Sequence, residues 1–210
     1  MLALIIRIIV AYLLGSLIGS LIVGKLYGGV DIRKLGSGNA GGTNALRTQG
    51  KIFALWVMSI DVGKGILAAG VVPHLFSSHH LLGIGWSAAV CGAAAMLGHV
   101  FPVFFRFRGG KGMATFLGVL LMLCWPALIV VLIVWVLVLI VTGYVGLSTI
   151  LATWSVPVYA LIVLSVNAPL FWFGLIMALF IVYTHRSNIQ RLMSGTEHRF
   201  ERAMLLHRLR

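Results

Sequence analysis

Long apolar runs constrain this chain more than any other feature of its sequence. They cover roughly residues 2–24, 52–72, 81–104, 113–142, 147–166 and 169–185. A helix needs about 20 apolar residues to cross a bilayer, and most of these runs have about that length. The chain is 60% hydrophobic and 10% charged, with a mean hydropathy of +1.07, which is unlike a soluble domain. The sequence therefore predicts an all-α polytopic membrane protein, with residues 1–210 as a single membrane-embedded domain.

The run over residues 113–142 is too long for one perpendicular crossing. As one helix it would measure about 45 Å, against a hydrocarbon core about 30 Å thick. It contains Cys124-Trp125-Pro126, and proline interrupts helices. A break there gives seven transmembrane helices, of which the fourth and fifth are short. The alternative is six spans, with one steeply tilted fourth helix.

The distribution of basic residues favours the break. They gather between the first two runs, at residues 106–111, and in the tail from residue 186 onwards. Cytoplasmic loops carry an excess of Lys and Arg. Seven helices place all three clusters on one side, with the N-terminus outside and the C-terminus cytoplasmic, whereas six do not. Residues 198–210 then form a basic cytoplasmic tail, and the first run is read as a retained span rather than a cleaved signal.

The chain has 16 Lys and Arg residues against four Asp and Glu residues. Besides setting the topology, this excess of basic residues is typical of proteins that bind anionic lipid or phosphorylated ligands. No nucleic-acid-binding motif is present. Cys91 and Cys124 lie in apolar runs, so we expect no disulfide framework. His74, His79 and His80 share a predicted outside loop, but no carboxylate or thiol accompanies them. We interpret them as interfacial polar residues rather than metal ligands.

The first polar motif, residues 36–47, reads Gly-Ser-Gly-Asn-Ala-Gly-Gly-Thr-Asn-Ala-Leu-Arg. Neighbouring glycines let successive backbone N–H groups converge on an anion, and the guanidinium of Arg47 matches phosphate oxygens. A P-loop is excluded, because Gly42-Thr43 stands where that motif requires Lys-Ser/Thr. The motif predicts a phosphate site, in which Ser37, Asn39, Thr43 and Asn44 supply side-chain donors beside Arg47.

The second polar motif, residues 98–115, contains Gly-Gly-Lys-Gly in front of an apolar run. A helix N-terminus supplies N–H groups and a positive dipole end, to which Lys111 adds its ammonium group. We interpret Arg106 and Arg108 as cytoplasmic anchors, and His99 as either a ligand-binding or a packing residue. The assigned anion-binding residues are Gly109, Gly110, Lys111 and Gly112.

In the third polar motif, His185, Asn188 and Arg191 recur at intervals of three, so they share one helical face at the membrane edge. A histidine can exchange a proton at neutral pH, and an asparagine can both donate and accept hydrogen bonds. The alternative is an amphipathic tail lying on anionic lipid, which suits residues 198–210 better.

Three further polar residues lie in or beside apolar runs. Asp61 and Lys64, three residues apart, predict an intramembrane ion pair with a structural or supporting role. Ser148 lies between two predicted helices and is a candidate for a ligand-contacting hydroxyl.

Several reaction classes lack the residues that they need. No histidine is followed five residues later by Asp or Glu, the arrangement that many acyl-CoA-dependent glycerolipid acyltransferases use. Outside the tail the acidic residues are Asp31 and Asp61, so a two-metal phosphoryl site has no ligand set. We therefore expect neither a metal nor a cofactor.

The three motifs, taken in order, resemble the signature motifs of the bacterial acyl-phosphate:glycerol-3-phosphate acyltransferase family over nearly the whole chain. The resemblance implies a seven-helix inner-membrane enzyme whose active site faces the cytoplasm. It would transfer a fatty acyl group from acyl phosphate to the sn-1 hydroxyl of glycerol 3-phosphate. The products would be lysophosphatidic acid and phosphate, in the first acylation of phospholipid synthesis. Its partners would be these substrates and membrane lipid, and a monomer is compatible with the activity.

The resemblance also implies roles for the motifs. The first would bind the phosphate of acyl phosphate and the second glycerol 3-phosphate, while Glu197 beside the third would be structural. We assign catalytic roles to Ser37, Arg47, Lys111, His185 and Asn188. The substrate-binding residues would be Gly38, Asn39, Gly41, Thr43, Asn44, His99, Gly109, Gly110, Gly112, Ser148 and Arg191.

Two other functions are compatible with basic, glycine-rich loops in a membrane protein. A transporter of phosphate or organic-phosphate anions would place polar groups near the bilayer midplane and often shows internal repeats. Here the motifs gather on one predicted face, and no repeat is visible. A non-enzymatic lipid-binding scaffold would not need such dense clusters of hydrogen-bond donors.

Overall fold

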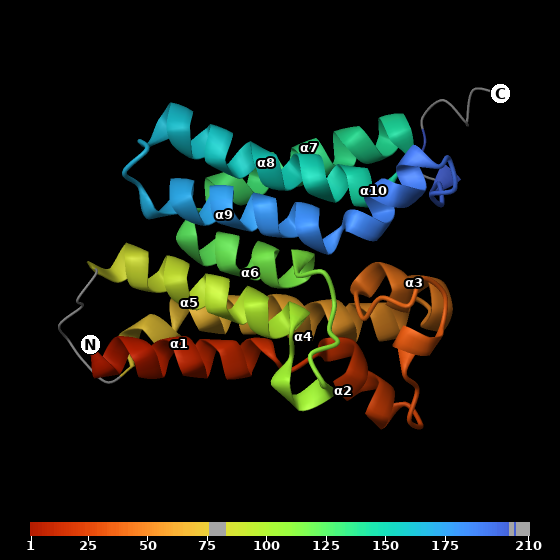
Figure 1. The fold of residues 1–210 in the computed structure, drawn as a ribbon, viewed down its shortest axis with the longest axis horizontal. Coiled ribbons are helices and arrows are strands. Elements are labelled where there is room, and N and C mark those ends of the chain that lie inside the picture. The colour runs from red at the N-terminus through yellow and green to blue at the C-terminus, as the bar shows by residue number, and fades with distance from the viewer. Residues whose placement is uncertain (76–82, 202–203, 205–210) are drawn as a thin grey trace. The chain divides into compact units, whose positions relative to one another are not determined.

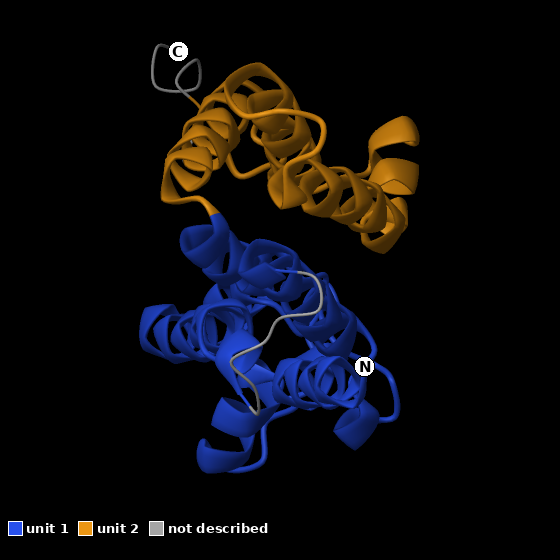
Figure 2. Cartoon of the chain, turned by 90° about the vertical axis from the view of Figure 1, so that its left-hand side faces the viewer, with its two compact units in different colours: residues 1–123 blue, residues 124–210 orange. Residues whose placement is uncertain are grey.

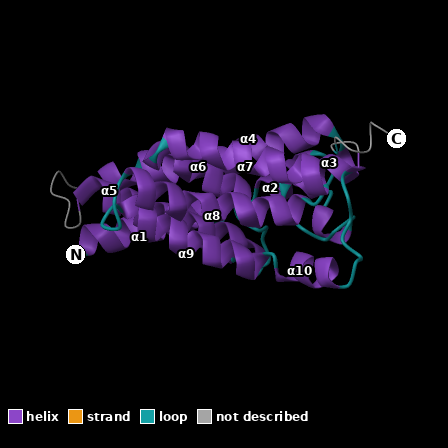
Figure 3. Ribbon diagram, turned by 90° about the horizontal axis from the view of Figure 1, so that it is seen from above, coloured by secondary structure: helices purple, strands orange, loops and turns teal. Residues whose placement is uncertain are grey.

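Helices account for all the regular structure in the described part of the chain (Figure 1). The computed structural model describes residues 1–75, 83–201 and 204, so His79 and His80 lie outside the described residues. The chain divides into two compact units, Met1–Leu123 and Cys124–Arg210 (Figure 2). No strand occurs among the described residues (Figure 3). The prediction of an all-α protein is confirmed.

Unit 1 is built from four apolar helices and shorter helical segments around their ends. The apolar helices are α1 (Leu2–Gly15), α4 (Lys51–Gly70), α5 (Gly83–Val100) and α6 (Met113–Leu123). The short helices are α2 (Gly19–Leu26), η1 (Ile32–Lys34), α3 (Gly42–Gln49), η2 (Val72–His74) and η3 (Val103–Phe105). Helix α1 packs on α5, α4 packs on α6, and α2 and α3 pack on α4.

Glycines set how closely these helices approach one another. At the α1–α5 contact, a Cβ atom on Gly98 would overlap the backbone carbonyl of Tyr12. At the α4–α6 contact, a Cβ atom on Gly65 or Gly118 would overlap backbone atoms of the facing helix. Close approach matters here because lipid gives no hydrophobic drive for helix association, so dense packing must supply it.

The first apolar run bends, although it contains no proline. We expected one helix over residues 2–24, but α1 and α2 meet at an angle of 46° across a short break. Two side chains of α4 bind backbone groups that the break frees: Lys64 Nζ donates to the carbonyl of Leu17 (2.8 Å), and Asp61 Oδ1 accepts from the N–H of Gly19 (3.1 Å). The bend is thus stabilised by another helix, because helix ends leave backbone groups without intrahelical partners.

Unit 2 contains α7 (Trp125–Thr142), α8 (Val145–Val163), α9 (Pro169–Thr184) and α10 (Arg186–Met193). Helix α8 packs on both α7 and α9, and α10 bends away from α9 by 58°. The start of the tail folds back on the turn between α7 and α8. There the N–H of Phe200 donates to the carbonyl of Gly143, and Arg199 Nε donates to the Tyr144 hydroxyl, both at 2.8 Å.

The predicted break in the run over residues 113–142 is confirmed. Helix α6 ends at Leu123, Cys124 is extended (φ −167°, ψ 90°), and α7 begins at Trp125 with Pro126 in its first turn. Among the described residues, four helical segments are long and apolar enough to cross a membrane, or six if each bent pair counts as one span. Helix α6 has 11 residues, about 16 Å of helix. The count of seven spans and their orientation remain predictions.

Candidate active site

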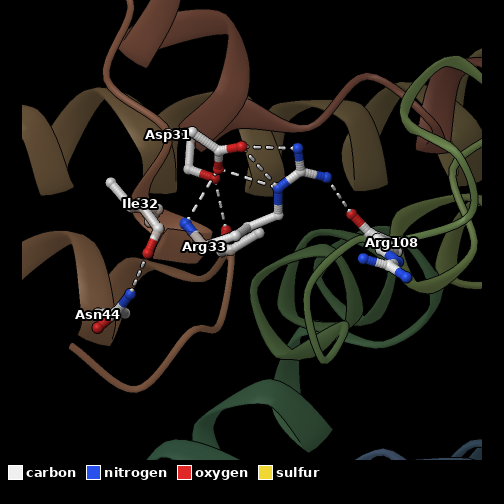
Figure 4. A network of polar contacts seen from close by, with 7 residues as sticks. Asp31, Ile32, Arg33, Asn44 and Arg108 are labelled. Atoms are coloured by element: carbon white, nitrogen blue, oxygen red, sulfur yellow. Dashed lines mark hydrogen bonds and ion pairs between the residues drawn. The ribbon is translucent and has the colours of Figure 1, made fainter. Parts of the chain in front are cut away.

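Asn44 organises the glycine loop, which we define as residues 36–41. Its side chain is 1% exposed. Its Oδ1 atom accepts from the N–H of Ser37 (3.0 Å), while Nδ2 lies 2.9–3.0 Å from the carbonyl oxygens of Ile32, Leu35 and Asn39. Figure 4 shows the contact with Ile32. Sequence reasoning assigned Asn44 to ligand binding. In the structure its amide holds the loop in shape.

The exposed donors of this motif lie before and along α3 (Gly42–Gln49). Ser37, Thr43 and Arg47 are exposed, and Thr43 and Arg47 are one helical turn apart, on the same face. In the part of the chain that the structure describes, no hydrogen bond uses the N–H of Gly42 or Thr43 as its donor. The first motif therefore combines available N–H groups at the start of α3 with two exposed hydroxyls and, one turn further along the helix, a guanidinium, which together favour an anion.

A bidentate ion pair just before the first motif holds the arginine that connects this part of the chain to the second motif (Figure 4). Arg33 Nη2 lies 2.8 Å from Asp31 Oδ2 and Arg33 Nε lies 2.9 Å from Asp31 Oδ1, while Arg33 Nη1 donates to the carbonyl of Arg108 (2.8 Å). The hydrogen bonds from Arg33 hold the pKa of Asp31 below its ordinary value, and Asp31 raises the pKa of Arg33. Sequence reasoning missed this link, because it joins residues that are 75 positions apart.

The lysine loop, which we define as residues 108–112, closes tightly on His99. The N–H of Gly110 donates to the carbonyl of His99 (3.1 Å). A Cβ atom on Gly109 would overlap that carbonyl, and one on Gly110 would overlap Nε2 of the His99 ring. The two glycines are therefore required by the position of His99. Lys111 follows, half-buried, immediately before Gly112 (φ 94°) and the start of α6.

His99 also belongs to a buried cluster with Asp61 and Lys64. Lys64 Nζ lies 2.8 Å from Asp61 Oδ1 and 2.8 Å from His99 Nδ1, and Asp61 Oδ1 lies 3.5 Å from His99 Nδ1. All three side chains are at most 3% exposed. The predicted ion pair between Asp61 and Lys64 is confirmed. The spacing of three residues revealed that pair, but it could not show that a histidine on α5 completes it.

In unit 2, His185 is the residue at which α9 gives way to α10. Its ring is buried, and Nδ1 lies 2.9 Å from the carbonyl of Ile181 and 3.2 Å from the hydroxyl of Thr184. A carbonyl can only accept, so Nδ1 bears the proton of that hydrogen bond. Nε2 is then the ring nitrogen whose protonation can change, and it can act as an acceptor or a donor.

Glu197 holds the other two residues of the third motif. Its Oε1 accepts from Asn188 Nδ2 (2.7 Å), and its Oε2 accepts from Arg191 Nε (2.6 Å). Asn188 also packs on α8, where a Cβ atom on Gly146 would lie 2.9 Å from Asn188 Cβ and Cγ. Asn188 and Arg191 therefore share one helical face, and Glu197, which follows α10, binds both side chains. Sequence reasoning did not identify Gly146 as part of this arrangement.

Ser148 lies on α8, close in sequence to Gly146. It is fully buried, and its hydroxyl donates to the carbonyl of Tyr144 (2.8 Å).

The described residues contain no group of three or more His, Cys, Asp or Glu side chains that could hold a metal ion. The structure thus brings the first two motifs together in unit 1, and joins His185, Asn188 and Arg191 on the α9–α10 segment of unit 2.

Comparisons with known proteins agree on one description. A family model described as glycerol-3-phosphate acyltransferase matches residues 5–195. A glycerol-3-phosphate acyltransferase of Chlorobaculum tepidum is 39% identical over 91% of this chain and 94% of its own length. One from Coxiella burnetii is 41% identical over 93% of this chain and 97% of its own length.

Two crystal structures of PlsY, an integral membrane glycerol 3-phosphate acyltransferase, also resemble this chain. Its glycerol 3-phosphate form has a TM-score of 0.83 and 36% identity, covering 94% of this chain and 95% of the other. Its lysophosphatidic acid form has a TM-score of 0.82 and 35% identity, covering 93% of this chain and 94% of the other.

Proposed function

This chain belongs to the glycerol-3-phosphate acyltransferase family, and from that premise we propose that it uses an acyl phosphate as its donor. The acceptor is the sn-1 hydroxyl of glycerol 3-phosphate, and the products are 1-acyl-glycerol 3-phosphate and phosphate. The observation that supports this most is that unit 1 holds two glycine-rich loops, each accompanied by a cationic side chain, Arg47 or Lys111. Two loops match two substrates that each bear one phosphate group.

The proposed roles in unit 1 follow from donor type and exposure. The N–H groups at the start of α3, with Ser37 and Thr43, bind the phosphate that leaves the donor. Arg47 and Lys111 bind the phosphate of glycerol 3-phosphate. The other assigned residues of both motifs shape the loops: Gly38, Asn39, Gly41, Asn44, His99, Gly109, Gly110 and Gly112.

The reaction needs positioning and charge stabilisation more than a strong base. An acyl phosphate is a mixed anhydride whose carbonyl carbon is already electrophilic. The sn-1 oxygen attacks that carbon, an ester C–O bond forms, the C–O bond to phosphate breaks, and phosphate leaves. Cationic groups and N–H donors offset the charge that develops on the leaving group. In this proposal a phosphate oxygen of the donor takes the hydroxyl proton.

His185 and Asn188 complete the proposed mechanism. Asn188 orients the attacking hydroxyl and Arg191 binds substrate. Because Nδ1–H is engaged with the carbonyl of Ile181, His185 donates from Nε2 as a protonated, positively charged ring. Ser148 binds substrate as a hydrogen-bond acceptor, because its own hydroxyl proton is donated to the carbonyl of Tyr144. The alternative is that His185 Nε2 takes the hydroxyl proton itself.

The two roles of His185 are separable by substitution. In His185→Gln the side-chain amide can still donate a hydrogen bond but cannot act as a base. We expect His185→Gln to stay within about tenfold of wild-type kcat, and His185→Ala to lose about 10²-fold or more. Equal large losses in both variants would instead indicate that the histidine is the base.

The proposed topology has seven spans, with the N-terminus outside and the C-terminus in the cytoplasm of a bacterial inner membrane. Residues 1–210 then act as one membrane-embedded enzyme with the active site facing the cytoplasm. Support comes from the basic residues around α3, in the lysine loop and along α10, which all belong on the cytoplasmic side by the positive-inside rule. Helix α6 is the short fourth span and implies local thinning of the bilayer.

The donor proposal is tested with protein purified in detergent or lipid and supplied with palmitoyl phosphate. We expect phosphate release that depends on both the protein and glycerol 3-phosphate, with one lysophosphatidate formed per phosphate. Phosphate release without lysophosphatidate, or no release, would overturn the proposal. Uptake of glycerol 3-phosphate into vesicles without acylation would favour the transporter alternative.

A further inference from the structure

Lys64 is a buried cation whose three protons all have partners. Its Nζ atom lies 2.8 Å from Asp61 Oδ1, from the carbonyl of Leu17 and from His99 Nδ1. An ammonium group has three donors and no acceptor. The carboxylate and the carbonyl both accept, so the third proton is directed at His99, and Nδ1 of that ring must be an acceptor.

The protonation of His99 follows from this contact. If Nδ1 accepts, a neutral imidazole carries its single proton on Nε2. Nε2 is the ring atom that lies against Gly110, where a Cβ atom would overlap it. Lys64 therefore both fixes the tautomer of His99 and holds the ring at the base of the lysine loop.

The same cluster also reaches the glycine loop. Lys64 binds the backbone at Leu17, within the break between α1 and α2, and Asp61 binds it at Gly19, the first residue of α2. One residue further, the hydroxyl of Ser20 donates to the carbonyl of Ala40 in the glycine loop (2.8 Å). An ionic cluster buried in apolar surroundings is costly to maintain, and intramembrane charges usually have a functional reason.

We propose that Lys64 is a positioning residue for glycerol 3-phosphate binding, acting by holding His99 as its Nε2–H tautomer beneath Gly110. This rests on the proposed assignment of the lysine loop to the phosphate of glycerol 3-phosphate. Lys64 does not touch substrate in this scheme. Removing its ammonium group frees the His99 ring to rotate or change tautomer, and the lysine loop loses its fixed support.

The kinetic test compares Lys64→Met with Arg7→Met. Arg7 is also a buried cation of unit 1, and its Nε donates to the carbonyl of Leu75 (2.9 Å), outside both loops. We expect Lys64→Met to lower kcat/KM for glycerol 3-phosphate about 10- to 100-fold through a higher KM, while Arg7→Met leaves that KM within about twofold of wild type. Equal KM values in the two variants would overturn the proposal.

Lys111→Met separates this proposal from the assignment on which it rests. If Lys111→Met leaves the KM for glycerol 3-phosphate unchanged, the lysine loop does not bind that substrate and the proposed function of the loop fails. If Lys111→Met raises this KM but Lys64→Met does not, the loop assignment stands and the role of Lys64 fails.

A spectroscopic measurement on the wild-type protein covers the case in which Lys64→Met does not fold. In protein labelled with ¹⁵N-histidine, the His99 signals are identified by their loss in His99→Asn. We expect a neutral ring protonated on Nε2, with Nδ1 unprotonated. A ring protonated on Nδ1 would contradict the proposal whatever the variants do.

Discussion

At the scale of single residues, the site depends on glycines that leave room for functional side chains. Gly110 gives room to the His99 ring, and Gly146 gives room to Asn188. Neither requirement comes from the glycine's own conformation, because neither has a positive φ. The requirement at Gly146 is set by Asn188, which is far away in the sequence, and this is why the sequence alone did not reveal Gly146.

Gly146→Ala tests whether the position of Asn188 matters for turnover. The added Cβ would lie 2.9 Å from Asn188 Cβ and Cγ, so Asn188 must shift. We expect kcat to fall about tenfold or more, measured as lysophosphatidate formation at saturating substrates. The control is Gly63→Ala in α4, where a Cβ would meet nothing within 4 Å. Similar kcat values in the two variants would show that Asn188 tolerates displacement.

The ion pair of Asp31 with Arg33 gives a prediction for pH. The pKa of Asp31 in the folded protein lies below its ordinary value of 3.8. The ion pair therefore stabilises the fold fully at pH values above 3.8, and this stabilisation is lost as pH falls through the lower pKa of the folded protein. Asp31→Asn should therefore reduce stability by about 1 kcal/mol or less at neutral pH.

Thermal unfolding of wild type and Asp31→Asn over a range of pH measures this effect. The difference in Tm should be constant between about pH 5 and pH 8 and shrink below about pH 4. A difference that instead disappears as pH rises towards 8 would show that the pair does not stabilise the fold through the ionised carboxylate.

At the scale of helices, close contacts between backbones hold unit 1 together. At Gly118 a Cβ atom would overlap the carbonyl of Val62 in the facing helix. Gly118→Ala should therefore destabilise the protein by about 1–3 kcal/mol, seen as a lower Tm in detergent. Gly63→Ala, in the open part of α4, should be neutral or stabilising by up to about 1 kcal/mol. A higher Tm for Gly118→Ala would contradict the helix contact.

The sequence predicted some of these elements and not others, for physical reasons. The break before Trp125 was predictable, because a proline coincided with a run longer than the bilayer is thick. The bend between α1 and α2 was not, since it contains no proline and is stabilised by Asp61 and Lys64 of another helix. The three polar motifs were visible as local patterns. The contact of His99 with Lys64 was not, because it joins residues 35 positions apart.

At the scale of the whole molecule, the seven-span and six-span topologies differ in whether the loop after the first span and the segment after the last span lie on the same side of the membrane. Lys34 and Gln190 are exposed and are suited to single cysteines in a variant with Cys91 and Cys124 replaced by alanine. With seven spans both positions face the cytoplasm, whereas with six they face opposite sides. We expect a membrane-impermeant maleimide to label both from the cytoplasmic side alone. Labelling from opposite sides would rule out the seven-span topology.

The identity of the acyl donor is the central claim, and a competition experiment tests it most directly. Reconstituted protein receives glycerol 3-phosphate with palmitoyl phosphate labelled with ¹³C in its acyl group, together with unlabelled palmitoyl-CoA. Mass spectrometry then reads the label in the lysophosphatidate formed. We predict that the product carries ¹³C palmitoyl chains throughout. Lysophosphatidate with unlabelled chains would contradict the account.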